Sequence, residues 1–453
     1  MVIARHVSTG AVSEAQTRRI ILLLSGSVVL MMTGYGLVMP VLGRRLGELG
    51  AGVDALGIIT MAFALAQMIG APLMGQLADT RGRRPIILLS LTAVTLAYVG
   101  YLLADTVVHF VLVRAGAGFL SAGLFPAVMG VVADLVPGER RARWAGVVMG
   151  SYAVGMVFGP VIGGVLYDAL GYTAPFLLSA VVAGTALIAT LAVIPETRTS
   201  EIRNRERLQA LRARPHGKTS LSLWEILPRP LTVFGALLLV DFINAFGFAF
   251  VEPQMIFYFY DTLGWSTTQF GVLVGLYGMS AVAGQFGLGQ LSDRWGRKPL
   301  IIAGLIPNIA FFGGLALITD YYTMMIGAVF AGLGNALLAP AANAFYLDIT
   351  AEEHRSRIIG VKGSVLSLGG VLGPLAVAVA SDYLPPQEVF WVACALTAGA
   401  LIIAVVGLKT PRQRERGAPG MDAQAAERRA LAAQASLQTI VRLATAARQG
   451  KAM

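Results

Sequence analysis

Two acidic residues lie in one long apolar segment and could carry protons. The segment LLLVDFINAFGFAFVEPQMIFYFY places Asp241 and Glu252 among mostly apolar and aromatic residues. Burial disfavours the charged form of a carboxylate, whereas a nearby cation favours it, so such a group can bind and release a proton as its surroundings change. The alternatives are a hydrated carboxylate near the membrane surface for Asp241 and a charge at the outer rim for Glu252, since we expect the helix to break at Pro253.

One arginine lies inside another apolar segment, HFVLVRAGAGFL. A charge within a membrane-spanning helix is costly and by default marks a functional site, so Arg114 is a candidate. The alternative is that its long side chain extends to the nearby membrane surface, because it lies only about two turns inside the segment.

The most distinctive motif is GQLADTRGRRP, from Gly75 to Pro85. A helix must end, turn tightly and restart there, and Gly82 and Pro85 suit that turn. We expect Asp79 to accept hydrogen bonds from nearby amides or from a helix N-terminus, where a negative charge is favourable. The alternative is that these charges only fix the turn and the orientation of the chain in the membrane.

The chain repeats this motif in its second half. GQLSDRWGRKP begins at Gly289, and the same offset aligns Pro126 with Pro340 and Asp134 with Asp348. Several matches in one register indicate two parallel repeats, a pattern typical of one large class of transporters.

A third pattern is a run of small residues in the segment 144–168. Small residues at helical spacing let a neighbouring helix approach closely, and a proline removes one backbone hydrogen bond. Ordinary glycine-rich packing is the alternative. The pattern consists of Gly146, Gly155, Gly159, Pro160, Gly163 and Gly164.

These residues require helices that cross a membrane. Of the 453 residues, 56% are hydrophobic and only 13% are charged, against about 25% charged residues in a soluble domain. About 20 apolar residues span a bilayer as a helix, and backbone exposed to lipid must satisfy its own hydrogen bonds. We predict spans at 19–42, 55–76, 85–104, 108–135, 144–168, 174–194, 230–252, 269–290, 299–318, 322–347, 359–380 and 388–408.

Basic residues orient these helices. With the N-terminus in the cytoplasm, all but three of the 35 lysines and arginines fall in cytoplasmic loops and tails, the exceptions being Arg44, Arg45 and Arg114. This bias predicts that both termini are cytoplasmic. The expected parts are a tail (1–18), a six-helix bundle (19–194), a linker (195–228), a second bundle (229–408) and a C-terminal tail (409–453).

The motif at Gly75 closely resembles the loop signature of the major facilitator superfamily, and the resemblance extends from the first to the twelfth span. It implies an all-α membrane protein with twelve transmembrane helices in two pseudo-symmetric six-helix bundles. In that family the loop is a gate. Its aspartate holds the bundles together on the cytoplasmic side when the site opens outward, and a paired arginine contacts an acid at the end of the fourth span. The matching residues are Asp79, Gly82, Arg83 and Asp134, with Asp293 and Arg297 in the second copy.

Two further resemblances concern proton coupling. The small-residue pattern is similar to the antiporter motif of the family's drug–proton exporters. Arg114 is similar to an arginine of the fourth span that assists proton transfer by pairing with acids. The expected proton-coupling residues are therefore Asp241, Glu252 and Arg114. The first span has no acid, unlike family members that carry one there, which puts their coupling scheme in doubt for this chain.

Polar, aromatic and methionine side chains are expected to line a substrate cavity, because they make adaptable walls. Any one of them could instead hold two helices together. The candidates are Met31, Tyr35, Asn244, Tyr277, Gln285, Asn343 and Tyr346.

These observations predict a monomeric secondary active exporter in the plasma (inner) membrane, which exchanges lipophilic or drug-like molecules for external protons. The proton is the coupling ion, and we expect no catalytic residue, metal or other cofactor. The chain has no GxxxxGK[ST] loop, so ATP hydrolysis is not expected to drive transport. The net charge of +10 does not indicate nucleic-acid binding, because the basic residues lack interleaved aromatic residues.

Two alternatives remain open. The first is a symporter or uniporter for a metabolite or lipid-like solute on the same fold. An anion symporter should show several cations in its cavity, whereas Arg114 is the only evident one. The second is a membrane receptor or scaffold that transports nothing.

Overall fold

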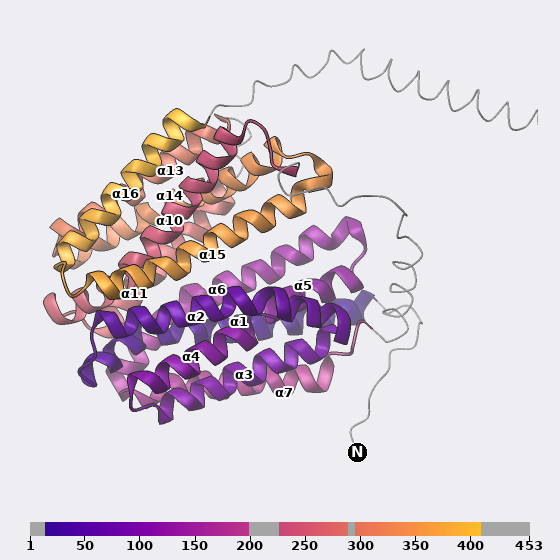
Figure 1. The fold of residues 1–453 in the computed structure, drawn as a ribbon. Coiled ribbons are helices and arrows are strands. Elements are labelled where there is room, and N and C mark those ends of the chain that lie inside the picture. Colours follow the sequence, from indigo (N-terminus) through magenta and orange to yellow (C-terminus); the bar gives the residue numbers. More distant parts are fainter. Residues whose placement is uncertain (1–13, 199–225, 289–294, 409–453) are drawn as a thin grey trace, which may run out of the picture. The chain divides into compact units, whose positions relative to one another are not determined.

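The computed structural model describes residues 14–198, 226–288 and 295–408, and these fold into helices (Figure 1). The N-terminal half contains α1 (Glu14–Glu48), α2 (Val53–Arg81), α3 (Arg83–Leu103), α4 (Val107–Ser121), α5 (Leu124–Leu135), α6 (Gly138–Leu170) and α7 (Thr173–Val193). The C-terminal half contains α10 (Leu231–Phe257), the π-helical turn η1 (Tyr258–Thr262), α11 (Thr267–Leu288), α13 (Arg297–Leu317), α14 (Tyr321–Ile349), the short 3₁₀ helix η2 (Glu352–His354), α15 (Arg355–Ala380) and α16 (Pro386–Gly407).

Twelve helical segments of the described residues are long and apolar enough to cross a membrane, which confirms the predicted number. Helices α4 and α5 together form one of these spans, Val107–Leu135. Several helices continue beyond the predicted ends, because helical backbone persists where the apolar stretch gives way to polar residues. The longest is α1, which extends to Glu48 and has basic Arg45 in its last turn.

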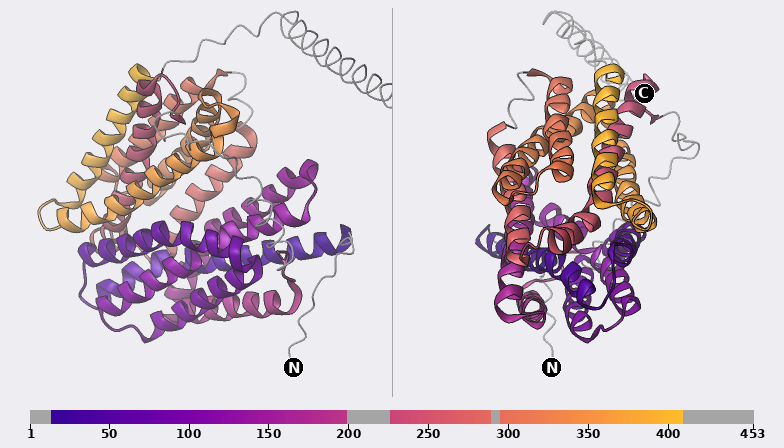
Figure 2. Two further views of the ribbon diagram at one scale, coloured as in Figure 1. Left: turned by 45° about the vertical axis from the view of Figure 1, so that its right-hand side comes forward. Right: turned by 90° about the vertical axis from the view of Figure 1, so that its left-hand side faces the viewer.

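The two halves repeat the same packing. In the N-terminal half α1 packs on α6, α2 on α4, and α3 on α7; in the C-terminal half α10 packs on α15, α11 on α14, and α13 on α16. The halves contact each other through α6 with α11 and through α2 with α15. Figure 2 shows the two halves, indigo to magenta and pink to yellow, from two further directions. This is the major facilitator fold that the sequence predicts.

Large apolar side chains cover the outer faces of the helices. Leu103, Phe286 and Val406 are each more than 70% exposed. Such side chains would be unfavourable in water but suit contact with lipid tails. Inside each half, bulky side chains such as Tyr101 and Phe312 are almost fully buried.

The small-residue pattern of α6 forms its contact with α1. A methyl group added to Gly159 would lie 2.6 Å from the carbonyl oxygen of Thr33, and one added to Gly163 would lie 2.7 Å from that of Leu37. Gly155 meets α1 in the same way one turn earlier. Because a side chain at these positions would collide with backbone, α1 and α6 approach each other closely only through glycine.

The other positions of the pattern have different surroundings. Gly164 lies against the backbone of Thr267 at the start of α11, and Gly271 of α11 lies against the carbonyl group of Pro160. These two contacts join the halves. A side chain at Gly146 would meet open space, so no close helix contact requires glycine there. Helix α6 continues through Pro160 without a break.

The contacts between the halves lie towards one end of the helices. We call the end that carries the α1–α2 turn the Gly50 end and the end that carries the α2–α3 turn the Gly82 end. Gly57, close to the start of α2, packs against Pro374 near the end of α15. The hydroxyl group of Tyr260 in η1 donates to the carbonyl oxygen of Pro40 at 2.8 Å. Both contacts lie towards the Gly50 end.

Replacing Gly159 by leucine should prevent the close approach of α1 and α6. Overpacking of this kind costs about 1–3 kcal/mol, and more where the obstacle is backbone. We expect Gly159→Leu to lower the melting temperature of the purified protein, whereas Gly146→Leu on the same helix should leave it unchanged. Equal melting temperatures for the two variants would contradict the described contact.

Candidate functional site

The turn between α2 and α3 is built around Gly82 and a carboxylate from the end of α7. Gly82 has φ of 116°, in the left-handed region that favours glycine. The amides of Arg83 and Arg84, the first of α3, donate to Glu196 at 3.0 and 3.2 Å. A negative charge is favourable at this position. The expectation that Asp79 would accept from a helix N-terminus is therefore wrong, because Glu196 occupies that position.

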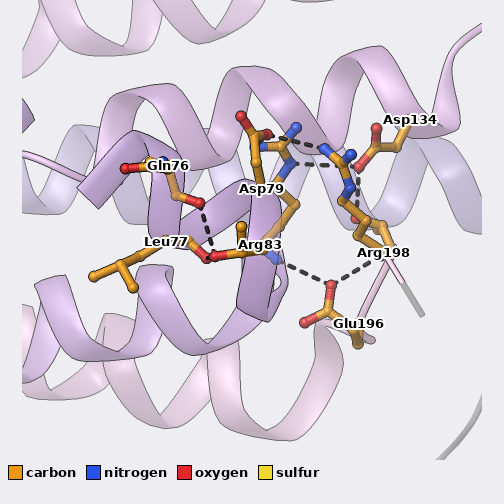
Figure 3. A network of polar contacts seen from close by, with 9 residues as sticks. Gln76, Leu77, Asp79, Arg83, Asp134, Glu196 and Arg198 are labelled. Atoms are coloured by element: carbon orange, nitrogen blue, oxygen red, sulfur yellow. Dashed lines mark hydrogen bonds and ion pairs between the residues drawn. The ribbon is translucent and has the colours of Figure 1, made fainter. Parts of the chain in front are cut away.

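Asp79 pairs instead with two arginines, as Figure 3 shows. Its Oδ1 lies 2.6 Å from Nη1 of Arg83 and 2.9 Å from Nη1 of Arg198. Nε of Arg83 lies 3.6 Å from Oδ2 of Asp134, which also accepts from the hydroxyl group of Thr197 at 3.1 Å. The structure thus brings the predicted gating residues together within the N-terminal half. Their role as a gate stays a prediction.

The segment after α7 supplies contacts that the sequence motifs did not reveal. Glu196, Thr197 and Arg198 all bind the α2–α3 turn or Asp134. The sequence feature that could have indicated these contacts is the pair of opposite charges directly after the sixth span, in the stretch PETR.

The second copy of the motif shows the same pairing. Nε of Arg297 lies 3.0 Å from Oδ2 of Asp348, the residue that aligns with Asp134. Gly296 has φ of 84° and corresponds to Gly82. Asp293, the predicted counterpart of Asp79, lies outside the described residues.

At the Gly50 end, one carboxylate connects the two halves. Asp168, near the C-terminal end of α6, accepts hydrogen bonds from the amides of Thr267 at 3.2 Å and Thr268 at 2.7 Å. These are the first amides of α11, where a negative charge is favourable. Asp168 was not predicted as a site residue. The sequence feature that could have indicated its role is its position, as an acidic residue at the end of the helix that carries the small-residue pattern.

Asp241 forms a buried ion pair. Its Oδ2 lies 3.4 Å from Nζ of Lys362, and both residues are 7% exposed. Nζ of Lys362 also donates to Oδ1 of Asn343 at 2.6 Å. Asp241 lies ten residues into α10, or about 15 Å along the helix. It is therefore a buried group, and the alternative of a hydrated carboxylate at the membrane surface is wrong.

Lys362 is the residue that sequence reasoning missed. It lies in α15, inside the predicted span 359–380, yet the charge count assigned it to a cytoplasmic loop. Arg114 was chosen as a candidate because it is a cation inside an apolar span, and Lys362 meets the same criterion. Contrary to the expectation from the sequence, Arg114 is therefore not the only cation inside the helices, because Lys362 is buried as well.

Arg114 is buried in the N-terminal half. It is 9% exposed, and its guanidinium carbon lies 4.3 Å from the ring centre of Phe63 and 5.0 Å from that of Tyr35. The side chain therefore does not extend to the membrane surface. Glu252 in α10 of the other half carries the opposite charge, but in the described conformation it does not form an ion pair with Arg114.

Glu252 lies within a continuous helix. Helix α10 passes through Pro253 to Phe257 and continues as η1. The expected break at Pro253 is therefore absent. A proline costs one backbone hydrogen bond, but neighbouring helices in a membrane protein can accommodate it.

A cavity of about 140 Å³ lies beside Arg114 in the N-terminal half. Met31 and Tyr35 line it, together with Phe63, Gln67 and Tyr98. Pockets for drug-sized molecules are about 300–1,000 Å³, so this cavity is large enough for only part of such a molecule.

The remaining predicted cavity residues are distributed over several places. Asn244 accepts from Asn308 at 3.4 Å, and the hydroxyl group of Tyr277 accepts from Asn335 at 3.2 Å. Gln285 is exposed. Asn343 and Tyr346 lie at the ion pair of Asp241. Helix-to-helix bonds account for most of these polar groups in the conformation described.

The described residues form twelve helices that are long and apolar enough to cross a membrane, in two repeated halves with charged groups buried among them. This arrangement defines a polytopic membrane transporter. The chain belongs to the Major Facilitator Superfamily, whose family model matches residues 24–248 and 237–447. Members of this family are transporters and not enzymes.

Curated relatives cover most of the chain. Tetracycline resistance protein, class C, from Escherichia coli is 32% identical over 368 residues, which cover 79% of this chain and 88% of that protein. Multidrug resistance protein 2 from Bacillus subtilis is 25% identical, with 80% of this chain and 88% of that protein covered. These distant relatives place the chain near the drug-efflux branch of the family.

A solved structure supports the fold. The crystal structure of the human organic anion transporter MFSD10 (TETRAN) matches with a TM-score of 0.61 and 21% sequence identity. The match covers 86% of this chain and 99% of that chain. At this identity the likeness concerns the fold alone.

We expect Asp79→Asn to impair transport while the protein still folds and inserts. Asp79 is half-exposed, and exposed ion pairs contribute about 0–1 kcal/mol to stability. Transport should fall about tenfold or more, which corresponds to a barrier raised by about 1.4 kcal/mol. Initial rates in proteoliposomes, with Asp382→Asn as an exposed control, measure the effect. Wild-type rates for Asp79→Asn at equal protein levels would contradict the gating role.

Asp168→Asn should weaken the contact between the halves at the Gly50 end, because a neutral amide is a poorer acceptor for the first amides of α11. We expect a cysteine introduced in the α11 N-terminal region to react faster with a membrane-impermeant maleimide in this variant than in the wild type. Asp382→Asn, at the same end, serves as the control. Unchanged labelling in Asp168→Asn would show that the carboxylate does not hold this end closed.

Proposed function

We propose that this protein is a proton-coupled exporter of lipophilic or drug-like molecules that works by alternating access. The observation that carries the proposal is the buried carboxylate of Asp241 in α10, which lies 3.4 Å from the buried ammonium group of Lys362. A second carboxylate, Glu252, lies on the same helix. Charged groups inside a membrane protein mark ion or proton pathways by default. The resistance proteins to which the chain is similar support the drug-like substrate class.

The proposed orientation places the Gly82 end in the cytoplasm, together with both termini. The distribution of lysines and arginines supports it. In this orientation the halves contact each other on the outer side, through Asp168 with α11 and Tyr260 with Pro40. The described conformation is then closed to the outside, and substrate enters from the cytoplasm. The proposed location is the cytoplasmic (inner) membrane.

Export requires the halves to rock about the central region. The Asp168 contact must break for the outer side to open. The Gly82 end must then close, and we expect the charged groups around Asp79 and Arg83 to exchange their partners within the N-terminal half for contacts with the opposite half. Glycine contacts between α6 and α11 at Gly164 and Gly271 allow the halves to pivot with few side chains in between.

The anion symporter remains the second candidate, because the structure reveals a second buried cation, Lys362. Lys362 is paired with Asp241, however, so its positive charge is already balanced and is not left over for a permanently bound anion. This balance favours proton exchange. The two functions predict opposite directions of substrate movement under one pH gradient.

The double variant Asp241→Asn/Glu252→Gln tests the proposal. We expect it to lose uphill transport driven by an imposed pH gradient in proteoliposomes, while downhill equilibration of a neutral substrate continues. Glu352→Gln, an exposed position near the Gly82 end, is the control. If the double variant still concentrates substrate against its gradient, another acid such as Asp79 or Asp134 carries the proton, and the assignment fails.

A further inference from the structure

Asp241, Lys362, Asn343 and Tyr346 form a polar cluster among α10, α14 and α15, in which Asn343 is the exposed member. Lys362 lies 3.4 Å from Oδ2 of Asp241 and 2.6 Å from Oδ1 of Asn343, and its ammonium group lies 5.1 Å from the ring centre of Tyr346. Tyr346 is fully buried, and the two charged residues are nearly so. All four belong to the C-terminal half, so the cluster does not depend on the contact between the halves.

The ammonium group of Lys362 has two acceptors in reach and makes its shorter contact with Asn343. Oδ2 of Asp241 has no hydrogen-bond partner among the described residues, although it lies within ion-pair distance of Lys362. Asn343 therefore remains as a hydrogen-bond partner of Lys362 when Asp241 is protonated and no longer needs a counter-ion. A purely structural ion pair would be expected to satisfy the buried carboxylate first.

We propose that Lys362 is a tethered counter-ion that makes proton release from Asp241 possible, and that the Asp241–Lys362 pair is the proton site of the C-terminal half. This proposal rests on the proposed proton exchange and assigns it to one pair. When Asp241 is ionised, Lys362 neutralises it. When Asp241 carries a proton, Asn343 and the ring of Tyr346 stabilise the ammonium group.

The net charge of the cluster explains why a lysine is needed. Without Lys362, the neutral and therefore favourable state in apolar surroundings would be protonated Asp241, which would keep its proton. With Lys362 present, the neutral state is the ionised carboxylate beside the ammonium group. The lysine thus shifts the favoured state from proton-bound to proton-free.

No other described titratable group acts on Asp241. The titratable side chains that face it are Lys362 from α15 and Tyr346 from α14. Helices α1, α2 and α16 and the turn η1 also pack against α10, and their described parts add no titratable side chain at Asp241. Glu252, on the same helix, lies eleven residues from Asp241 and does not act on it.

Infrared spectroscopy of the purified protein in liposomes tests the pair without any substrate or gradient. We expect a protonated-carboxyl band that titrates in the wild type and is lost in Asp241→Asn. Lys362→Gln should move its midpoint to higher pH by about one unit or more, because the carboxylate loses the cation that favours its ionised form. Lys362→Arg should keep the midpoint near that of the wild type. Lys298→Gln, the other lysine in the described residues, is the control.

Transport measurements give the second readout. Lys362→Gln should move the pH profile of proton-driven transport to higher pH, and Asp241→Asn/Lys362→Gln should lose uphill transport but keep downhill exchange. The double variant removes both buried charges and leaves no unpaired ion, so we expect it to fold even if Lys362→Gln alone does not accumulate.

Two results would overturn the proposal: a titrating carboxyl band that is unchanged in Asp241→Asn or that keeps its wild-type midpoint in Lys362→Gln, and full uphill transport by the double neutral variant. Either would leave the pair with a structural role only. If the wild type itself shows no proton-driven transport, the proposed function fails separately, and the infrared band still decides whether Lys362 is the counter-ion of Asp241.

Discussion

A charge buried in apolar surroundings must be neutralised, and this constraint shapes the interior of the molecule. Desolvation costs several kcal/mol for each unpaired ion, so a buried carboxylate needs either a cation or a proton. Asp241 has Lys362 at 3.4 Å, and this pair lies inside the C-terminal half. Glu252 and Arg114 carry opposite charges and belong to different halves, without forming an ion pair in the described conformation. Movement of the halves must therefore change the surroundings of Glu252 and Arg114, which links charge to conformation.

The contacts at the two ends have different chemistry. At the Gly50 end, Asp168 joins the halves through the amides that begin α11, and close glycine contacts lie beside it. At the Gly82 end, the described ion pairs of Asp79 and Arg83 and of Arg297 and Asp348 join residues within one half. If the halves can be in contact at only one end at a time, the protein cannot be open at the Gly50 end and at the Gly82 end together. Alternating access requires this.

Local sequence patterns predicted the helices and the repeat well, because length and apolar character decide membrane spans and lipid leaves the backbone few alternatives. The close packing of α6 on α1 also followed from spacing, since only glycine permits such an approach at Gly159 and Gly163. These properties depend on residues near one another in the chain.

Properties that depend on distant residues were harder to predict. Glu196 replaces Asp79 at the start of α3 because the end of α7 lies beside that turn, which no local pattern shows. Lys362 lies inside the predicted span 359–380 but was counted with the loop before it, and its pairing with Asp241 of α10 joins residues far apart in the sequence. The predicted cavity residues do not share one site, because their surroundings also depend on residues far away in the sequence. Gln285 is exposed, whereas Tyr346 is fully buried.

The most direct test of the central claim is the direction of proton movement that substrate addition causes. Wild-type protein would be reconstituted in liposomes that contain a pH-sensitive dye, without an imposed gradient, and a transported compound from a panel of lipophilic drugs would be added outside. The account predicts that substrate entering the liposomes drives protons out, so the interior becomes more alkaline. Acidification of the interior, or no proton movement during measured substrate uptake, would contradict proton exchange.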